Sequence, residues 1–258
     1  MIHNNISEMR KALLIGTSKD ITHHINNIIY FLNTSRNYNH IMTITCETTQ
    51  KPTRAVIMGL IKQLLCDNQP GDELWFYYIG NVDVVNDVAI WPMDYDKNGF
   101  ITDDDLQREL IDKLRVGVSL YMIMDCIHSG NGLDLRYMYN DKSKYIGNDS
   151  TIIKYNFKDW QLIESLTENR KYTKTLGNVF IISCCKEELD KISELGGLTI
   201  IFLKVLKSNY GNIKWKYLLK DLKCLLKIKG YNKIPQLSAG RPIDLNGLMF
   251  PNYSMVFC

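Results

Sequence analysis

Along this chain, short apolar runs that end at a glycine or a polar residue alternate with longer stretches in which apolar residues recur every three or four positions. The first pattern predicts buried strands, and the second predicts amphipathic helices. Strands are predicted at residues 11–16, 41–45, 73–79, 120–124 and 179–184. Helices are predicted at residues 21–32, 55–65, 106–114, 197–206 and 213–228. This alternation is typical of a mostly parallel sheet with helices on both faces.

The predicted strand at residues 120–124 is followed at once by a polar segment that ends in glycine. The segment reads Asp125, Cys126, Ile127, His128, Ser129 and Gly130. Open α/β sheets bind ligands at the carboxyl ends of their strands, which makes this segment the first candidate for a functional site. Adjacent residues at a strand end point to opposite faces, so the side chain of Cys126 is expected to face the core.

The same segment resembles the nucleophile loop of the metacaspases, a family of caspase-like cysteine peptidases. In that family the loop reads Asp-(Ser or Cys)-Cys-His-Ser-Gly, and this chain differs from it at the nucleophile position, where Ile127 stands. Further matches, in the same order along the chain, lie at residues 90–106, 125–137 and 235–245. The resemblance extends from about residue 11 to about residue 250.

The resemblance implies a caspase-like three-layer α/β sandwich, whose mostly parallel sheet has six strands and carries helices on both faces. Residues 1–258 are expected to form a single domain of this kind. Residues 10–139 correspond to its large-subunit-like part and residues 178–250 to its small-subunit-like part. Residues 140–177 are polar and rich in Lys, Asn and Tyr, which indicates either a linker between the two parts or a long surface insertion. A short helix is expected there, at residues 160–166.

The two residues that define a cysteine peptidase are replaced in this chain. By the resemblance, Ile127 stands at the nucleophile position and Asn81 at the position of the catalytic base. Isoleucine forms no thiolate and asparagine takes no proton near neutral pH, so a loss of activity on the order of 10⁶-fold is expected. The sequence therefore predicts a non-catalytic regulator, decoy or scaffold. Its partner would be a protein or peptide, with an active metacaspase homologue as one candidate.

An enzymatic alternative places the nucleophile one residue earlier. If the loop is shifted, Cys126 is the nucleophile and His128 its base, and the chain is a residual cysteine endopeptidase that cleaves after Arg or Lys. The expected burial of Cys126 argues against this, because a buried free cysteine usually packs as a small apolar side chain. His128 is then expected to be a structural hydrogen-bonding group.

A second set of candidate residues concerns the substrate. In the family, two acidic residues line the pocket for the basic side chain of the substrate. One of these positions falls on Asp125 and the other on His24, so this chain keeps one of the two acids. Asp125 has an alternative role, in which its carboxylate accepts hydrogen bonds from loop amides. The sequence favours neither role over the other.

Calcium is the one cofactor that the resemblance suggests, because many metacaspases are activated by it. The corresponding carboxylates are Asp103, Asp104 and Asp134, with Asp87 as a candidate fourth ligand. Calcium prefers about six to eight oxygen ligands, which carboxylates, carbonyls and waters can supply together. This hypothesis makes the chain a calcium-responsive interaction module. In the alternative, the acids at residues 103–105 only cap the helix that follows them.

Composition excludes several other classes of protein. The formal net charge of +3 does not indicate binding to nucleic acid. Seven cysteines at irregular spacing, without a Cys-x-x-Cys pair, indicate neither a disulfide framework nor a zinc site. No apolar stretch is long enough to span a bilayer, and no apolar signal segment opens the chain. A reducing, cytoplasmic location is therefore expected.

Overall fold

The computed structural model describes most of the chain, with gaps between the described segments. The described residues are 8–81, 90–126, 133, 135–140, 153–156, 161–164, 175–186, 195–231 and 233–251. In this part of the chain no helix is long and apolar enough to cross a membrane.

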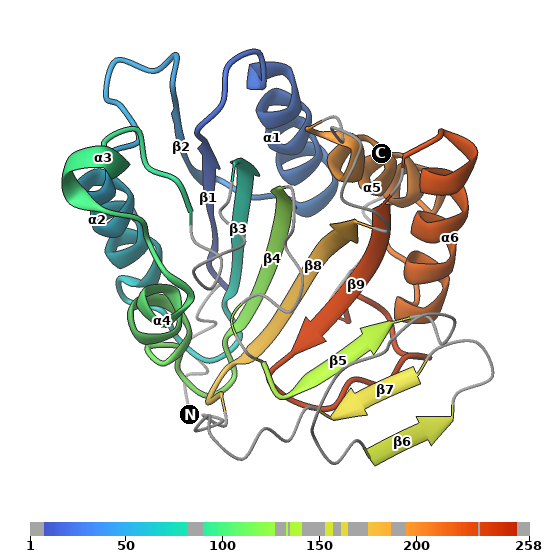
Figure 1. The fold of residues 1–258 in the computed structure, drawn as a ribbon. Coiled ribbons are helices and arrows are strands. Elements are labelled where there is room, and N and C mark those ends of the chain that lie inside the picture. The colour runs from blue at the N-terminus through green and yellow to red at the C-terminus, as the bar shows by residue number, and fades with distance from the viewer. Residues whose placement is uncertain are drawn as a thin grey trace.

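The strands of the described residues form one nine-stranded sheet in the order β2-β1-β3-β4-β8-β9-β5-β7-β6 (Figure 1). Its parallel part consists of β1 (Arg10–Gly16), β2 (His40–Thr45), β3 (Glu73–Gly80), β4 (Ser119–Cys126) and β8 (Asn178–Lys186). Its antiparallel part consists of β9 (Lys233–Ala239), β5 (Tyr137–Asn140), β7 (Gln161–Glu164) and β6 (Ile153–Asn156). The expected mostly parallel sheet is thus present as its first six strands.

The expected count of six strands is wrong, because three antiparallel strands extend the sheet beyond β9. β5 pairs with β9, and its other edge is covered by β7 and then β6. Both β6 and β7 come from residues 140–177, the stretch that was expected to be a linker or a surface insertion. The helix expected at residues 160–166 is wrong for the same reason, since β7 occupies residues 161–164. An exposed strand edge offers unpaired backbone groups, and pairing with it overrides the local helical spacing.

Helices cover both faces of the sheet, which confirms the three-layer sandwich (Figure 1). One face packs against α1 (Thr22–Arg36), α5 (Gly197–Ser208) and α6 (Trp215–Ile228). The other face packs against α2 (Arg54–Leu65) and against α4 (Asp103–Leu106), which continues as the π-helical turn η1 (Gln107–Ile111). The short helix α3 (Tyr95–Asn98) lies beside α2 in the view of Figure 1.

Period-two alternation along the central strands assigns each side chain to one of these two layers. All eight residues of β3 are buried. Trp75 and Tyr77 belong to the apolar cluster under α1, α5 and α6, whereas Phe76 and Tyr78 belong to the cluster under α2 and η1. A strand that is buried on both faces reads as a continuous apolar run in the sequence, which explains why β3 and β4 could be recognised.

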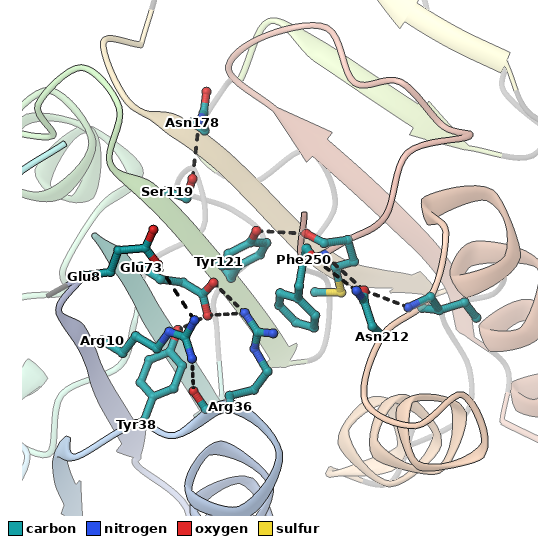
Figure 2. Close-up of polar contacts among 12 residues, drawn as sticks. Glu8, Arg10, Arg36, Tyr38, Glu73, Ser119, Tyr121, Asn178, Asn212 and Phe250 are labelled. Carbon is teal, nitrogen blue, oxygen red and sulfur yellow. Dashed lines mark hydrogen bonds and ion pairs between the residues drawn. The ribbon is translucent and has the colours of Figure 1, made fainter. Parts of the chain in front are cut away.

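A buried ion pair lies at the amino ends of the parallel strands (Figure 2). The guanidinium of Arg36, at the end of α1, donates to both carboxylate oxygens of Glu73 at distances of 2.8 and 2.6 Å. The hydroxyl of Tyr38 donates to the same carboxylate at 2.9 Å. The Arg36 guanidinium also lies 3.9 Å from the centre of the Phe250 ring. This cluster joins α1, β3 and the C-terminal segment.

Phe250 is held both by its ring and by its backbone. The ring is fully buried, and its centre lies 5.0 Å from that of Tyr121 and 6.2 Å from that of Trp75. The side-chain amide of Asn212 donates to the Phe250 carbonyl at 2.9 Å and accepts from its N–H at 3.2 Å. The C-terminal segment is therefore part of the core of the fold.

We expect Phe250→Ala to lower the free energy of unfolding by about 3–5 kcal/mol, because it leaves a cavity and removes the aromatic face beneath Arg36. Denaturant unfolding followed by circular dichroism measures this. Tyr30→Ala is the matched control: Tyr30 lies on α1 and is 71% exposed. Its free energy of unfolding should stay within about 0.5 kcal/mol of the wild type. Equal effects of the two changes would contradict this description of the core.

Candidate functional site

The carboxyl end of β3 carries Asn81, which is exposed to solvent. Its backbone is fixed by Tyr78, whose hydroxyl donates to the Asn81 carbonyl at 2.6 Å. The same hydroxyl lies 2.9 Å from the side-chain oxygen of Thr17 and accepts from the Trp91 N–H at 3.3 Å. Burial raises the pKa of Tyr78, so the hydroxyl keeps the proton that it donates.

Gly80 is required by this close packing. A Cβ atom at this position would lie 2.2 Å from the side-chain oxygen of Thr17 and 2.6 Å from the hydroxyl of Tyr78. Any larger residue would displace the hydroxyl that fixes Asn81. The chain therefore leaves β3 along one defined path and presents Asn81 at the carboxyl edge of the sheet.

At the end of β4, two neighbouring residues face opposite layers. Cys126 is 1% exposed and belongs to the apolar cluster under α2 and η1. Asp125 is equally buried, but its contacts lie on the other face, with α5 and β9. The alternation of side chains along a strand produces this division. The expectation that Cys126 faces the core is confirmed.

The carboxylate of Asp125 is fully engaged by groups of the chain itself. Its Oδ2 accepts from the backbone N–H of Thr199 at 2.8 Å and from the Thr199 hydroxyl at 2.6 Å. Its Oδ1 lies 3.3 Å from the ammonium of Lys233, the first residue of β9. The Thr199 oxygen also lies 2.7 Å from the hydroxyl of Tyr77. Burial and the charge of Asp125 together raise the pKa of Tyr77.

His24, on α1, is buried beside this group. Burial lowers its pKa, and the neighbouring charges of His23 and Lys233 act in the same direction, while Asp125 acts against them. A Cβ atom at Gly196, just before α5, would lie 2.0 Å from Nε2 of His24. The structure thus brings His24 and Asp125, the two expected pocket residues, into one buried polar cluster. Their part in a substrate pocket stays a prediction.

Several expected site residues lie outside the described residues. These are Ile127 at the nucleophile position, His128 as the fallback base, and the candidate calcium ligands Asp87 and Asp134.

Of the candidate calcium ligands, Asp103 and Asp104 are described. The carboxylate of Asp103 accepts from the backbone N–H of Leu133 at 3.2 Å, and Asp104 is exposed. Within the described residues, no three His, Cys, Asp or Glu side chains come together as a metal site would require. The carboxylates that the structure describes do not by themselves assemble a calcium site, and calcium binding stays a prediction.

The neighbouring Asp105 has a structural role. Thr102 and Asp105 form a capping box, so the helix begins at Asp103, three residues earlier than expected. Asp105 also accepts from Arg54 of α2 at 2.7 Å and from Arg108 at 2.5 Å. Although burial opposes ionisation, the hydrogen bonds from Arg108 and Thr102 and the charge of Arg54 lower the pKa of Asp105. The capping alternative is confirmed for this residue.

A family model described as the metacaspase peptidase C14 domain matches residues 10–136. Metacaspase-1 from Candida albicans is 28% identical over 95% of this chain and 68% of its own length. A protein named Inactive metacaspase-4, from Trypanosoma brucei brucei, is 30% identical over 76% of this chain and 58% of its own length. The chain belongs to the metacaspase family.

Solved structures share the fold of this metacaspase homologue. The crystal structure of protein GSU0716 from Geobacter sulfurreducens aligns with a TM-score of 0.58 at 16% sequence identity. The alignment covers 92% of this chain and 95% of that one. At this level of identity the likeness shows a shared fold and nothing about activity.

The metacaspase resemblance did not reveal Lys233, Thr199 or Tyr77. Each is a common residue type in an ordinary position, and Lys233 lies 108 residues from Asp125 in the sequence. Lys233 stands two residues before the Pro-Gln-Leu-Ser match at residues 235–238, which is the one local signal that could have drawn attention to it. Its contact with Asp125 depends on the pairing of β9 with β8.

The buried His24 of this metacaspase homologue should make stability depend on pH. Its pKa is lowered in the folded state, so below about pH 6.5 the unfolded chain binds a proton that the folded chain does not. We expect the free energy of unfolding to fall between about pH 7.5 and about pH 5.5, by at most about 1.4 kcal/mol per pH unit from this residue.

Urea unfolding at the two pH values measures this effect. His24→Gln should reduce the pH dependence, whereas the same change at His40, which is exposed on β2, should leave it unaltered. If His24→Gln and the wild type lost the same stability on acidification, the assignment would be refuted.

Proposed function

We propose that this metacaspase homologue does not cleave peptides and acts instead by binding, as a regulator, decoy or scaffold. The observation that carries the proposal is the burial of Cys126. It is the one thiol at the end of β4, next to the nucleophile position, and it is 1% exposed within an apolar cluster. A nucleophilic cysteine must form a thiolate beside a base and reach the substrate, and an apolar environment opposes all of these.

The residues at the two catalytic positions support the same proposal. By the family resemblance, the base position falls on Asn81 and the nucleophile position on Ile127. An amide cannot accept a proton near neutral pH, and an alkyl side chain cannot attack a carbonyl. The two replacements agree with each other, since a site without a nucleophile has no use for a base. A relative named Inactive metacaspase-4 is also among the similar proteins.

The polar cluster around Asp125 supports the proposal independently. A pocket for the basic side chain of a substrate needs a carboxylate that can reach it. Here Asp125 has a fully buried side chain, and Thr199 and Lys233 contact both of its oxygens. A caspase-like fold in which the chain's own groups occupy this carboxylate supports a role in which the fold binds a protein surface. An active metacaspase homologue, or one of its protein substrates, is the partner that we propose.

We expect the purified protein to release no product from fluorogenic peptides that end in Arg or Lys, with or without millimolar calcium. The reason is that the thiol of Cys126 is buried, and that Ile127 and Asn81 stand at the positions of the nucleophile and the base. The matched control is Cys126→Ala, which should give the same baseline as the wild type. Cleavage by the wild type that disappears in Cys126→Ala would overturn the proposal and make Cys126 a nucleophile.

The binding role leads to a separate expectation. If the protein sequesters an active metacaspase or its substrate, rising amounts of it should slow cleavage of a protein substrate by that metacaspase in a saturable manner. The assay needs equal amounts of an unrelated protein of similar size as its control. A rate that does not change, together with no complex in analytical ultracentrifugation, would exclude the proposed partner.

A further inference from the structure

The ion pair between Asp125 and Lys233 is unusually well shielded from water. The side chain of Asp125 is 0% exposed and that of Lys233 is 3% exposed. Aspartate and lysine are almost never fully buried unless they are paired, because a charge that leaves water loses its hydration. The two charges are therefore tolerated in the interior only because they lie next to each other. Loss of either one would leave the other buried without a counter-charge.

The topology explains how the lysine reaches this position. β9 runs antiparallel to β8, so its first residue lies at the edge where the parallel strands end. Lys233 opens β9, and Asp125 is the last residue but one of β4. Ligand sites of α/β sheets lie at this edge. The chain has thus placed its own ammonium group where a ligand would be expected.

The groups around Asp125 are arranged as in a binding site for a cation. Thr199, in the first turn of α5, supplies two donors to Oδ2 and so fixes the orientation of the carboxylate. The remaining oxygen, Oδ1, faces the ammonium of Lys233. A carboxylate held in this way suits an alkylammonium or a guanidinium group, which are the cations of Lys and Arg side chains.

We propose that Lys233 is an internal counter-ion that occupies the place of a peptide's basic side chain at Asp125 and keeps this site closed to Arg- and Lys-containing peptides. The inference rests on the proposed function in one respect, because it concerns the same edge of the sheet. It adds the residue that blocks the site, the ammonium group of Lys233.

Chemical rescue tests this proposal. Lys233→Ala should melt at a lower temperature than the wild type, because it leaves the Asp125 carboxylate buried without its cation. Added n-butylammonium or agmatine should then raise the melting temperature of Lys233→Ala, by about 3 °C at a concentration tenfold above the dissociation constant. An equal concentration of sodium chloride controls for ionic strength.

Two further variants show whether the site itself binds the cation. Lys233→Met fills the same space without a charge, so it should not respond to n-butylammonium. Lys233→Ala/Asp125→Asn has the space without the carboxylate and should not respond either. The proposal is overturned if folded Lys233→Ala gains no more from these cations than the wild type does, or if the double variant gains as much as Lys233→Ala.

If Lys233→Ala does not fold, the wild-type protein itself provides the test. Under reductive methylation with mass-spectrometric mapping, Lys233 should react at least tenfold more slowly than Lys220, which is exposed on α6. Asp125→Asn should make Lys233 more reactive, because it removes the counter-charge. Equal reactivity of Lys233 and Lys220 in the wild type would overturn the proposal. Neither readout involves cleavage, so failure here is distinguishable from failure of the non-catalytic proposal.

Discussion

Neighbouring side chains at the end of a β-strand point to opposite faces of a sheet, and this constraint decides what the end of β4 can do. It directs Cys126 into the apolar layer under α2 and η1, and Asp125 into the layer under α1 and α5. A thiol and a carboxylate that are adjacent in the sequence are therefore separated by the sheet itself. No rotation of side chains brings both of them to the same substrate.

The face of the sheet that packs against α1, α5 and α6 carries a buried ion pair at each end of the parallel strands. At the amino end, Arg36 contacts Glu73, and at the carboxyl end Lys233 contacts Asp125. The aromatic layer that contains Trp75, Tyr77 and Tyr121 belongs to this face as well. Loss of one member of a buried pair costs about 3–5 kcal/mol, so each pair ties distant segments to one arrangement of the chain. Both partners at the carboxyl end are already engaged within the chain.

Much of the fold could be predicted from the sequence, because β3 and β4 are continuous apolar runs and the helices keep their regular spacing. The burial of Cys126 followed from strand alternation alone. The extra strands β6 and β7 could not be predicted, since they exist only through strand pairing, β7 with β5 and β6 with β7. Lys233 was missed for a related reason. Its contact with Asp125 arises from the register of β9 on β8, which no local pattern encodes.

The most direct measurement of the central claim, that no usable thiol lies at the end of β4, is the alkylation rate of each cysteine in the native protein. Iodoacetamide labelling, quenched over time and mapped by mass spectrometry, gives these rates. Cys224 is exposed and should react quickly, whereas Cys126 should react only on the timescale of unfolding. Labelling of Cys126 in the folded protein as fast as Cys224 would contradict the account.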